Sequence, residues 1–504
     1  MHVLEGQGAQ LERFFYDHPY FGQLFLAAVF KMIGYPNSLK PSIGDIHSIE
    51  LIYLVPRILM GILAIIDTFL IYKICERRYN RNIGLFASVL FAVMPVITWL
   101  LRWILLESIQ LPFVLSSLLF TLYVKGSKNN NKNDNILLSK ENDKINNKII
   151  ITKDTLLVLL SGIFLGLAIF TKVPAVTMIP LVGFLIYRNN NMDLKAIGLW
   201  FIPVILIPLI WPAYAASVGQ LGDWMNGIHF QSQRSNTFKY WINGTYFRID
   251  PVLFTLGMAG LVFAVIRKDF FILLWIIPFL IFVFFIGWIL LFHVALLLPA
   301  FCIASSRLIE SLSNKISMKK ARQIFPYAII SAIGSFGMIE TTILIIDNVN
   351  YSFFETTAFL TNYLQNNNSI NKSNHVNDIT VISSPIYSWI PQYVFHLEGR
   401  YLNYYDVATD LTDFNANDIQ TKTKKVILIS DREFRTSLST NNKAALQIQE
   451  IYNLNSTKNI VAIFEDNLHS YYKIFIYQFD YNPSVRFCTL ENCNWLHSLY
   501  THRS

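Results

Sequence analysis

Residues capable of acid–base and anion chemistry stand immediately before the first apolar stretch of the chain. Asp17 and His18 precede Pro19, and the apolar run Leu24 to Ala28 follows within a few residues. Proline is best tolerated in the first turn of a helix, so this pattern predicts a helix that begins at a membrane edge beside an acid and an imidazole. Such a group suits a polar site that faces a lipid-borne substrate. Asp17 could equally be only the cap of that helix.

Further polar residues lie at the ends of later apolar segments, where they are costly and therefore candidates for function. We predict Asp17 and Glu107 as catalytic carboxylates. The predicted substrate-binding residues are His18, Tyr20, Arg57, Arg102, Lys172 and His293. Cations would neutralise a phosphate leaving group while a carboxylate deprotonates an acceptor hydroxyl. The combination suits a sugar carried on a polyprenyl phosphate.

Each of these residues also has a structural interpretation. Arg57 and Arg102 are typical of side chains that snorkel from a span end to the membrane surface. Glu107 could be a surface partner of Arg102, and Lys172 could be an anchor that fixes topology. His293 could be a satisfied polar group between packed helices. The sequence leaves both interpretations open.

The composition predicts a polytopic α-helical membrane protein. Of 504 residues, 53% are hydrophobic and 15% are charged, against about 25% charged in soluble domains. The apolar residues form about ten blocks near the length that crosses a bilayer. These blocks are Leu51 to Tyr72, Ile83 to Leu101, Ser108 to Val124, Leu156 to Phe170, Val173 to Tyr187, Ile197 to Ala216, Pro251 to Ile266, Phe270 to Phe285, Trp288 to Leu308 and Ile324 to Ile346. Tyr20 to Ile33 is shorter and is expected to lie at the interface.

Charge predicts the orientation of these spans. Basic loops alternate with sparsely charged ones, and basic loops are cytoplasmic by the positive-inside tendency. This places residues 1–50, the candidate site and everything after Ile346 outside a plasma membrane. Sequons at Asn243, Asn350, Asn367, Asn371 and Asn455 all fall on that side. The net charge of +8 is then a topology signal, and we expect no nucleic-acid partner.

Three regions follow from this division: an outer loop with interfacial helices over 1–50, a transmembrane domain over 51–346 and an extracytoplasmic α/β domain over 347–504. An Asn- and Lys-rich segment, 126–150, is predicted to be a disordered cytoplasmic insertion. In the last region, strands are expected at 378–382, 426–430, 460–464 and 472–477, with a helix over 442–452. Cys488 and Cys493 lie there and could form a disulfide, because oxidation is permitted outside the cell.

The region around Asp17 also resembles a known family. The run Tyr16-Asp17-His18-Pro19-Tyr20-Phe21-Gly22-Gln23 is similar to the Asp-x-His-Pro-Pro-Leu-Gly-Lys pattern of C-type glycosyltransferases. These are related to dolichyl-phosphate-mannose protein mannosyltransferases, ArnT-type aminoarabinose transferases and RgtA/B/C/D-like enzymes. The stretch Tyr53-Leu54-Val55-Pro56-Arg57 fits the family's Tyr-x-x-Pro-Arg, and Arg102 with Glu107 resembles its Arg and acidic residue at the next outer turn.

The resemblance covers roughly Glu5 to Ile346 and implies a C-type fold and transfer of a sugar from a polyprenyl (dolichyl) phosphate. The acceptor would be a protein, lipid or glycan at the outer face of the bilayer. The implied donor is the lipid-linked sugar; no metal ligands are assigned, although a divalent metal is compatible with this chemistry. The alternatives are a non-catalytic assembly subunit and a transporter of lipid or solute.

Two departures from the family pattern bear on activity. Gln23 stands where the family has Lys, which weakens a phosphate contact there. Met1 to Gly8 resembles the end of the family's first outer loop, which normally follows a transmembrane helix and carries an acidic pair. We expect an upstream extension that encodes both; otherwise the chain is a reduced relative.

Overall fold

The structure is a computed structural model, and it describes most of the chain in separate stretches. The described residues are 18–124, 153–190, 193–233, 250–286, 291–346, 351–370, 379–403, 425–439, 445–446, 448–449, 458–464 and 473–480. Asp17, the segment 126–150, the sequon residues Asn243, Asn350, Asn371 and Asn455, and both Cys488 and Cys493 lie outside them, so the predictions made for these residues stay untested.

Contacts divide the chain into two compact units. The first, here called the helical unit, comprises Met1–Met32 and Val55–Ile346. The second, here called the sheet unit, comprises Ile33–Leu54 and Asp347–Ser504. Each is described by itself.

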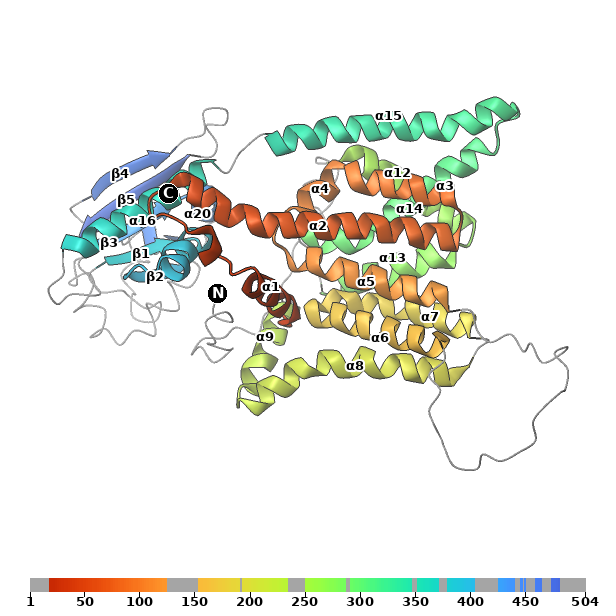
Figure 1. Ribbon diagram of the computed structural model, residues 1–504, viewed down its shortest axis with the longest axis horizontal. Helices are drawn as coiled ribbons and strands as arrows, with labels where there is room; N and C mark the ends of the chain where they lie inside the picture. The colour runs from red at the N-terminus through yellow and green to blue at the C-terminus, as the bar shows by residue number, and fades with distance from the viewer. Residues whose placement is uncertain are drawn as a thin grey trace, which may run out of the picture. The chain divides into compact units, whose positions relative to one another are not determined.

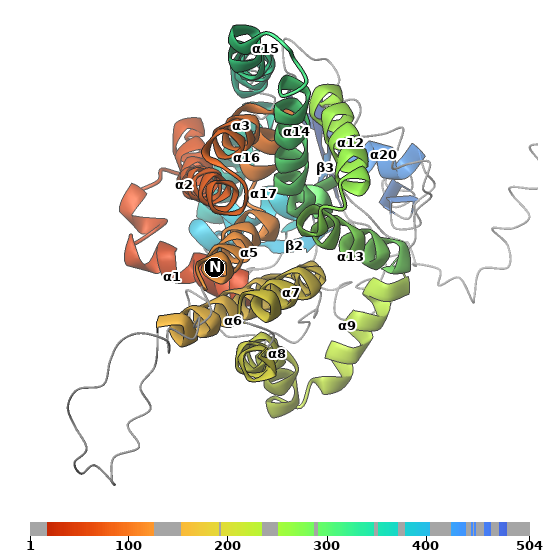
Figure 2. The ribbon, with the colours of Figure 1, turned by 90° about the vertical axis from the view of Figure 1, so that its right-hand side faces the viewer.

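The helical unit consists of helices that lie side by side (Figures 1 and 2). Its elements are α1 (Phe21–Met32), most of α2 (Ile46–Arg78), α3 (Arg81–Val93), α4 (Pro95–Leu101), α5 (Leu106–Tyr123), α6 (Lys153–Thr171), η2 (Val173–Met178), α7 (Ile179–Asn189), α8 (Leu194–Ser217), α9 (Leu221–Gln233), α12 (Pro251–Ile266), α13 (Phe270–Ile286), η3 (Leu291–Leu297), α14 (Leu298–Ser313) and α15 (Lys319–Ile346). The described parts of all ten apolar blocks identified in the sequence fall in or directly beside these elements.

The expected number of ten spans is not confirmed. Among the described residues, six helices are long and apolar enough to cross a membrane, and bent pairs raise this to eight. The pair α3 and α4 bends by 63° and the pair α12 and α13 by 117°. The block Val173–Asn189 is shorter than a span. Block length in the sequence does not reveal such breaks.

Proline and a buried carboxylate account for the break between α3 and α4. Met94 is extended and Pro95 begins α4, as expected because proline disfavours helical backbone in the preceding residue. Asp250 caps α12 by accepting a hydrogen bond from the Leu253 amide at 2.8 Å, and it also accepts one from the Val96 amide at 3.4 Å. Asp250 therefore joins the first turns of α4 and α12.

Close packing of α6 against α8 depends on two glycines. A Cβ atom at Gly162 would lie 2.4 Å from the backbone oxygen of Trp200, and one at Gly166 would lie 2.6 Å from that of Pro203. Both distances are far shorter than real Cβ contacts, so only glycine permits this approach. Small residues serve the same purpose in other membrane helix pairs.

A buried polar network lies where the chain turns from α12 into α13. Asp269 is paired with Arg307 of α14 and accepts a hydrogen bond from the Tyr79 hydroxyl at 2.9 Å. The Arg307 guanidinium also lies 4.5 Å from the centre of the Tyr79 ring. The network thereby links the end of α2, the α12–α13 turn and α14.

Asp67 is an exception among the buried carboxylates. It lies in the middle of α2, on the buried stripe that also carries Met60, Leu63 and Ile71, and is 1% exposed. Neither of its side-chain oxygens has a hydrogen-bond partner. Its place in the stripe is that of a core residue.

The sheet unit contains one five-stranded sheet with strand order β2-β1-β3-β5-β4. The strands are β1 (Ile379–Ser383), β2 (Arg400–Asn403), β3 (Lys425–Ser430), β4 (Lys458–Phe464) and β5 (Ile474–Asp480). Strand β1 pairs in parallel with β2 and β3, and β5 pairs antiparallel with β3 and β4. The helical elements of the unit are η1 (Asn37–Leu39), α16 (Tyr351–Ile370), α17 (Pro385–Trp389), η4 (Ile390–Val394) and α20 (Arg432–Ser439).

The four expected strands are present within a few residues, and β2 is an addition. At four residues, β2 is too short to give an alternating pattern. The helix expected over 442–452 lies largely outside the described residues. The combination of a helical membrane region with a C-terminal α/β sheet confirms the predicted fold class.

The Tyr53 of the family-like stretch belongs to the sheet unit. Its hydroxyl donates to the backbone oxygen of Ile386 at 3.1 Å and accepts from the indole nitrogen of Trp389 at 2.6 Å. Its ring packs against those of Phe353 and Phe354. Tyr53, which belongs to the family-like Tyr-x-x-Pro-Arg stretch, thus packs the first turns of α2 within this unit.

Candidate functional site

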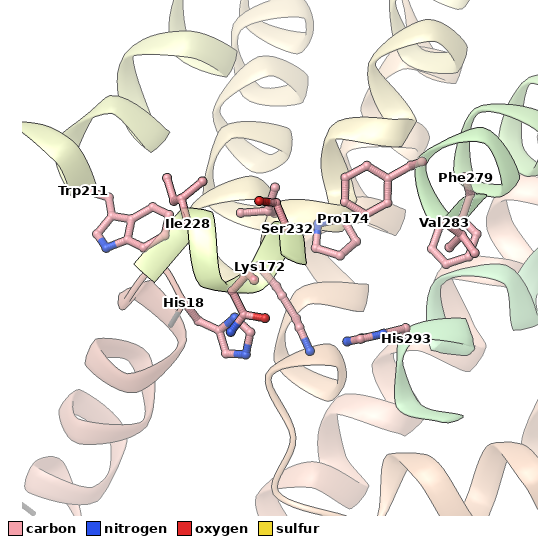
Figure 3. Close-up of a pocket in the computed structure, with 12 residues that line it drawn as sticks. His18, Lys172, Pro174, Trp211, Ile228, Ser232, Phe279, Val283 and His293 are labelled. Carbon is pink, nitrogen blue, oxygen red and sulfur yellow. The ribbon is translucent and has the colours of Figure 1, made fainter. Parts of the chain in front are cut away.

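A cavity of about 220 Å³ lies in the helical unit (Figure 3). Its walls come from the segment that leads into α1, the α6–η2 junction, the end of α8, α9, α13 and η3. The lining residues are His18, Lys172, Val173, Pro174, Trp211, Ile228, Gln231, Ser232, Phe279, Phe282, Val283 and His293. Most are apolar, and the cationic or titratable ones are three residues that the sequence had singled out.

Lys172 is placed by the end of a helix. Helix α6 stops at Thr171, Lys172 is extended, and Pro174 fixes the start of η2. The side chain is buried, with 3% exposed, although it is a lysine. In Figure 3 it extends toward the space between His18 and His293. Because Lys172 is extended between α6 and η2, its ammonium group points to the cavity.

The partner of Lys172 is Glu107 in the first turn of α5. The Lys172 ammonium donates to a carboxylate oxygen of Glu107, which is 5% exposed. The ammonium also lies 4.7 Å from the centre of the Phe292 ring. Buried lysine and glutamate normally require such pairing. From the sequence, Glu107 could have been a surface partner of Arg102. In the structure Glu107 is buried and paired with Lys172.

Gln110 binds the backbone around Lys172. It was not among the residues predicted from the sequence to form the site. Its side-chain nitrogen donates to the backbone oxygen of Ala168 at 3.0 Å and to that of Lys172. Glu107 and Gln110 are three residues apart on α5 and so share one face of the helix. The Glu-x-x-Gln spacing was the only available signal, and it is common in ordinary helices.

The two histidines reach the cavity from short segments. His293 belongs to η3, which is fixed by a hydrogen bond from the Trp275 indole nitrogen to the backbone oxygen of Leu296 at 3.0 Å. The rings of His293 and Phe292 are 4.7 Å apart. His18 precedes α1, and Tyr20 beside it packs edge to face on Phe170 at 5.1 Å. Tyr20 is not one of the described lining residues and thus contributes by fixing the start of α1.

Arg57 and Arg102 form a second cationic feature. Arg102 follows α4 and is partly buried, and Arg57 lies one residue after Pro56 in α2. Burial lowers the pKa of the Arg102 guanidinium, and the positive charge of Arg57 lowers it further. Two neighbouring cations favour an anion between or beside them. Neither arginine is among the described residues that line the cavity.

Metal binding has no visible basis in the described part of the chain, where no group of three His, Cys, Asp or Glu residues could hold an ion. The described site combines an oriented ammonium group, two imidazoles and a largely apolar wall.

Comparison with known proteins agrees with the family resemblance. Residues 7–211 match the family of dolichyl-phosphate-mannose-protein mannosyltransferases, which confirms the resemblance over these residues. No curated protein sequence matches the chain.

Several solved structures are similar in fold. ArnT from Cupriavidus metallidurans bound to undecaprenyl phosphate is 11% identical with a TM-score of 0.45, covering 94% of this chain and 91% of ArnT. The Archaeoglobus fulgidus oligosaccharyltransferase tethered with an acceptor peptide is 12% identical with a TM-score of 0.48. That match covers 94% of this chain, which spans only 66% of the oligosaccharyltransferase. Because these similarities are distant, the functional argument rests on the family match and on the geometry.

Proposed function

We propose, with the match of residues 7–211 to the mannosyltransferase family as the premise, that the chain is a membrane glycosyltransferase. It would transfer a sugar from a polyprenyl phosphate to a protein, lipid or glycan acceptor. The observation that carries this proposal is the buried Lys172–Glu107 pair at the border of a mostly apolar cavity.

The geometry around Lys172 supports a phosphate subsite. An ammonium group has three N–H donors, and Glu107 accepts one of them. The remaining donors offer positive charge and hydrogen bonds to phosphate oxygens, and the imidazoles of His18 and His293 offer further hydrogen bonds. The aromatic and aliphatic residues of α13, Phe279 and Val283, suit the isoprenoid units next to the phosphate.

The roles of the two candidate carboxylates then differ. Because Glu107 is held in an ion pair, it orients Lys172 and keeps its charge in place. Asp17, next to His18 in the sequence, is the proposed base that removes the proton of the acceptor hydroxyl. The acceptor oxygen forms a bond to the anomeric carbon while the bond from that carbon to the phosphate oxygen breaks, and the phosphate leaves with the electron pair. A single displacement of this kind inverts the anomeric carbon.

The remaining assignments complete the proposal. Arg57 and Arg102 are proposed to hold a second anionic group, such as a phosphate of the approaching lipid. The reaction would take place on the side that the basic loops predict to be outside the plasma membrane, where lipid-linked sugars are the available donors.

The test is sugar transfer by the purified full chain in lipid nanodiscs. Radiolabelled donors would be a panel of dolichyl-phosphate and undecaprenyl-phosphate sugars, including dolichyl-phosphate-mannose. Glu107→Gln and Lys172→Met should each reduce transfer by at least about 100-fold, because oxyanion-stabilising groups typically contribute that much. Lys195→Met, which removes an exposed lysine at the start of α8, should leave transfer unchanged. Transfer near the wild-type rate in both buried variants would reject the proposal.

A transporter is the second candidate, and the two bent helix pairs favour it. Transporters often contain discontinuous helices near the substrate site, and α12 and α13 meet at 117°. Accumulation of a labelled polyprenyl phosphate inside proteoliposomes, without any transfer of sugar, would support transport.

A further inference from the structure

Among the described residues, four side-chain nitrogens of α8 and α9 are buried without a hydrogen-bond acceptor. They are the indole nitrogens of Trp200, Trp211 and Trp224 and the amide nitrogen of Gln231. Trp200 is not among the residues that line the cavity. Trp211 is 5% exposed, and both Trp211 and Gln231 line the cavity. Buried donors are nearly always paired in folded proteins, because an unpaired one loses its hydrogen bonds to water without replacement.

The buried indoles of Trp211 and Trp224 are stabilised in part by their contact with each other. Their rings lie 5.6 Å apart at 81°, in an edge-to-face arrangement that is favourable for aromatic pairs. The amide nitrogen of Gln231 is buried without a hydrogen-bond partner. On α9, Trp224, Ile228 and Gln231 follow each other at intervals of four and three residues and so share one face of the helix. That face supplies the cavity with Ile228 and with the unpaired amide.

We propose that the Gln231 amide is the sugar-selecting group of the cavity and donates a hydrogen bond to a hydroxyl oxygen of the donor sugar. Trp211 lines the cavity beside it, and Trp224 packs on Trp211. This inference rests on the proposed function and identifies the part of the donor that α9 contacts.

The charge distribution favours the sugar over the phosphate at this wall. The ammonium group of Lys172 and the imidazoles of His18 and His293 reach the cavity from other segments than α9. Its α9 wall contributes Ile228, Gln231 and Ser232, which are neutral. A neutral amide suits a neutral hydroxyl, whereas phosphate prefers charged donors.

The experiment compares two lipids that differ only in the sugar. Binding of dolichyl-phosphate-mannose and of dolichyl phosphate to the full chain in nanodiscs is measured for the wild type and for Gln231→Leu, which has a similar size and no donor. We expect the affinity for the mannosyl lipid to fall about tenfold, as for the loss of one hydrogen bond in a desolvated site, and the affinity for dolichyl phosphate to remain within about twofold.

Two further variants control the measurement. Asn226→Leu changes an exposed amide elsewhere on α9 and should alter neither affinity. Gln231→Met provides a second replacement without a donor if Gln231→Leu fails to fold, as judged by its thermal unfolding.

The outcomes separate this inference from the proposed function. Equal loss for both lipids would place the amide on the phosphate, and no loss for either would leave it without a ligand; each result overturns the inference. If Lys172→Met weakens the binding of both lipids while the Gln231 variants change neither affinity, the proposed function is supported and the sugar contact is rejected. Wild-type protein that binds neither lipid, or binds both equally, also overturns the inference, the first result together with the function.

Discussion

The helical unit contains two buried carboxylate–cation pairs with different surroundings. At one, Asp269 is paired with Arg307 and also accepts the hydroxyl of Tyr79. At the other, Glu107 is paired with Lys172, whose ammonium borders a cavity and the face of Phe292. Asp269 immediately precedes α13, whereas the cavity residue Val283 lies near its other end, roughly 20 Å away at 1.5 Å per residue.

The difference indicates which pair is structural and which is available to a ligand. The Asp269 pair links three segments and has an additional partner for its carboxylate. The Lys172 ammonium has donors left over and a cavity beside it. Burial of a charge pair is thus not in itself a sign of function; unused hydrogen-bonding capacity next to a cavity is the more informative property.

Breaking the Glu107–Lys172 pair should give the largest effect. Either Glu107→Leu or Lys172→Met leaves one buried charge unpaired and should lower the free energy of unfolding by about 3–5 kcal/mol. The double variant should recover most of that loss, because it removes both charges, yet it should not recover sugar transfer. Thermal unfolding and transfer assays on the three variants measure both quantities; recovery of transfer in the double variant would assign the pair a purely structural role.

Breaking the Asp269 network should affect stability alone. Asp269→Ala strands Arg307, which is partly exposed, and should cost about 2–3 kcal/mol. Tyr79→Phe removes one hydrogen bond to a charged group and should cost about 1.5 kcal/mol. Transfer per folded molecule should equal that of the wild type. A reduced transfer rate in folded Asp269→Ala would remove the contrast between the two pairs.

Asp67 extends the comparison to a buried carboxyl group with no partner. Asp67→Val replaces an unsatisfied polar group in a core stripe by an apolar one and should raise the free energy of unfolding by about 1–2 kcal/mol. Asp67→Asn keeps a polar group there and should raise it less. Equal destabilisation by both substitutions, measured by chemical unfolding in detergent, would imply that the carboxyl group has a partner in the membrane.

The smallest expected effect concerns Asp250. Burial raises the pKa of its carboxyl group, against amide hydrogen bonds that lower it. The folded protein therefore retains a proton that the unfolded chain releases above its ordinary pKa of about 4, so this contribution to stability is lost as the pH rises through the higher folded value. In thermal unfolding between pH 4 and 7, Asp250→Asn should show a flatter pH dependence than the wild type. Identical pH profiles would show that Asp250 does not titrate differently in the folded protein.

Much of the architecture could be predicted because it depends on long apolar blocks. Hydrophobicity and length identify helices such as α8 and α15 without knowledge of their neighbours. The break at Met94 and the meeting of α12 with α13 depend on tertiary contacts, so the number of crossings could not be read. Strand β2 has only four residues and gave no periodic signal.

Three of the residues that line the cavity could be singled out from the sequence, but their arrangement could not. His18, Lys172 and His293 were identified by their polar character at the ends of apolar blocks, and the structure brings these three to one cavity. The pairing of Glu107 with Lys172 joins residues 65 positions apart, which no local pattern specifies. Gln110 and Gln231 are common residue types in helices, and only burial distinguishes them.

Gly162 and Gly166 have a consequence for how chains of this type can diverge. Any side chain at either position must displace the backbone of α8. Trp211 follows Pro203 by eight residues on that helix, about 12 Å along its axis, so a methyl group added at the glycines is transmitted to a wall of the cavity. If the proposed function holds, the preference for a donor can change through substitutions at positions that do not contact the substrate. A comparison of the cavity-lining residues between two such chains would not reveal these substitutions.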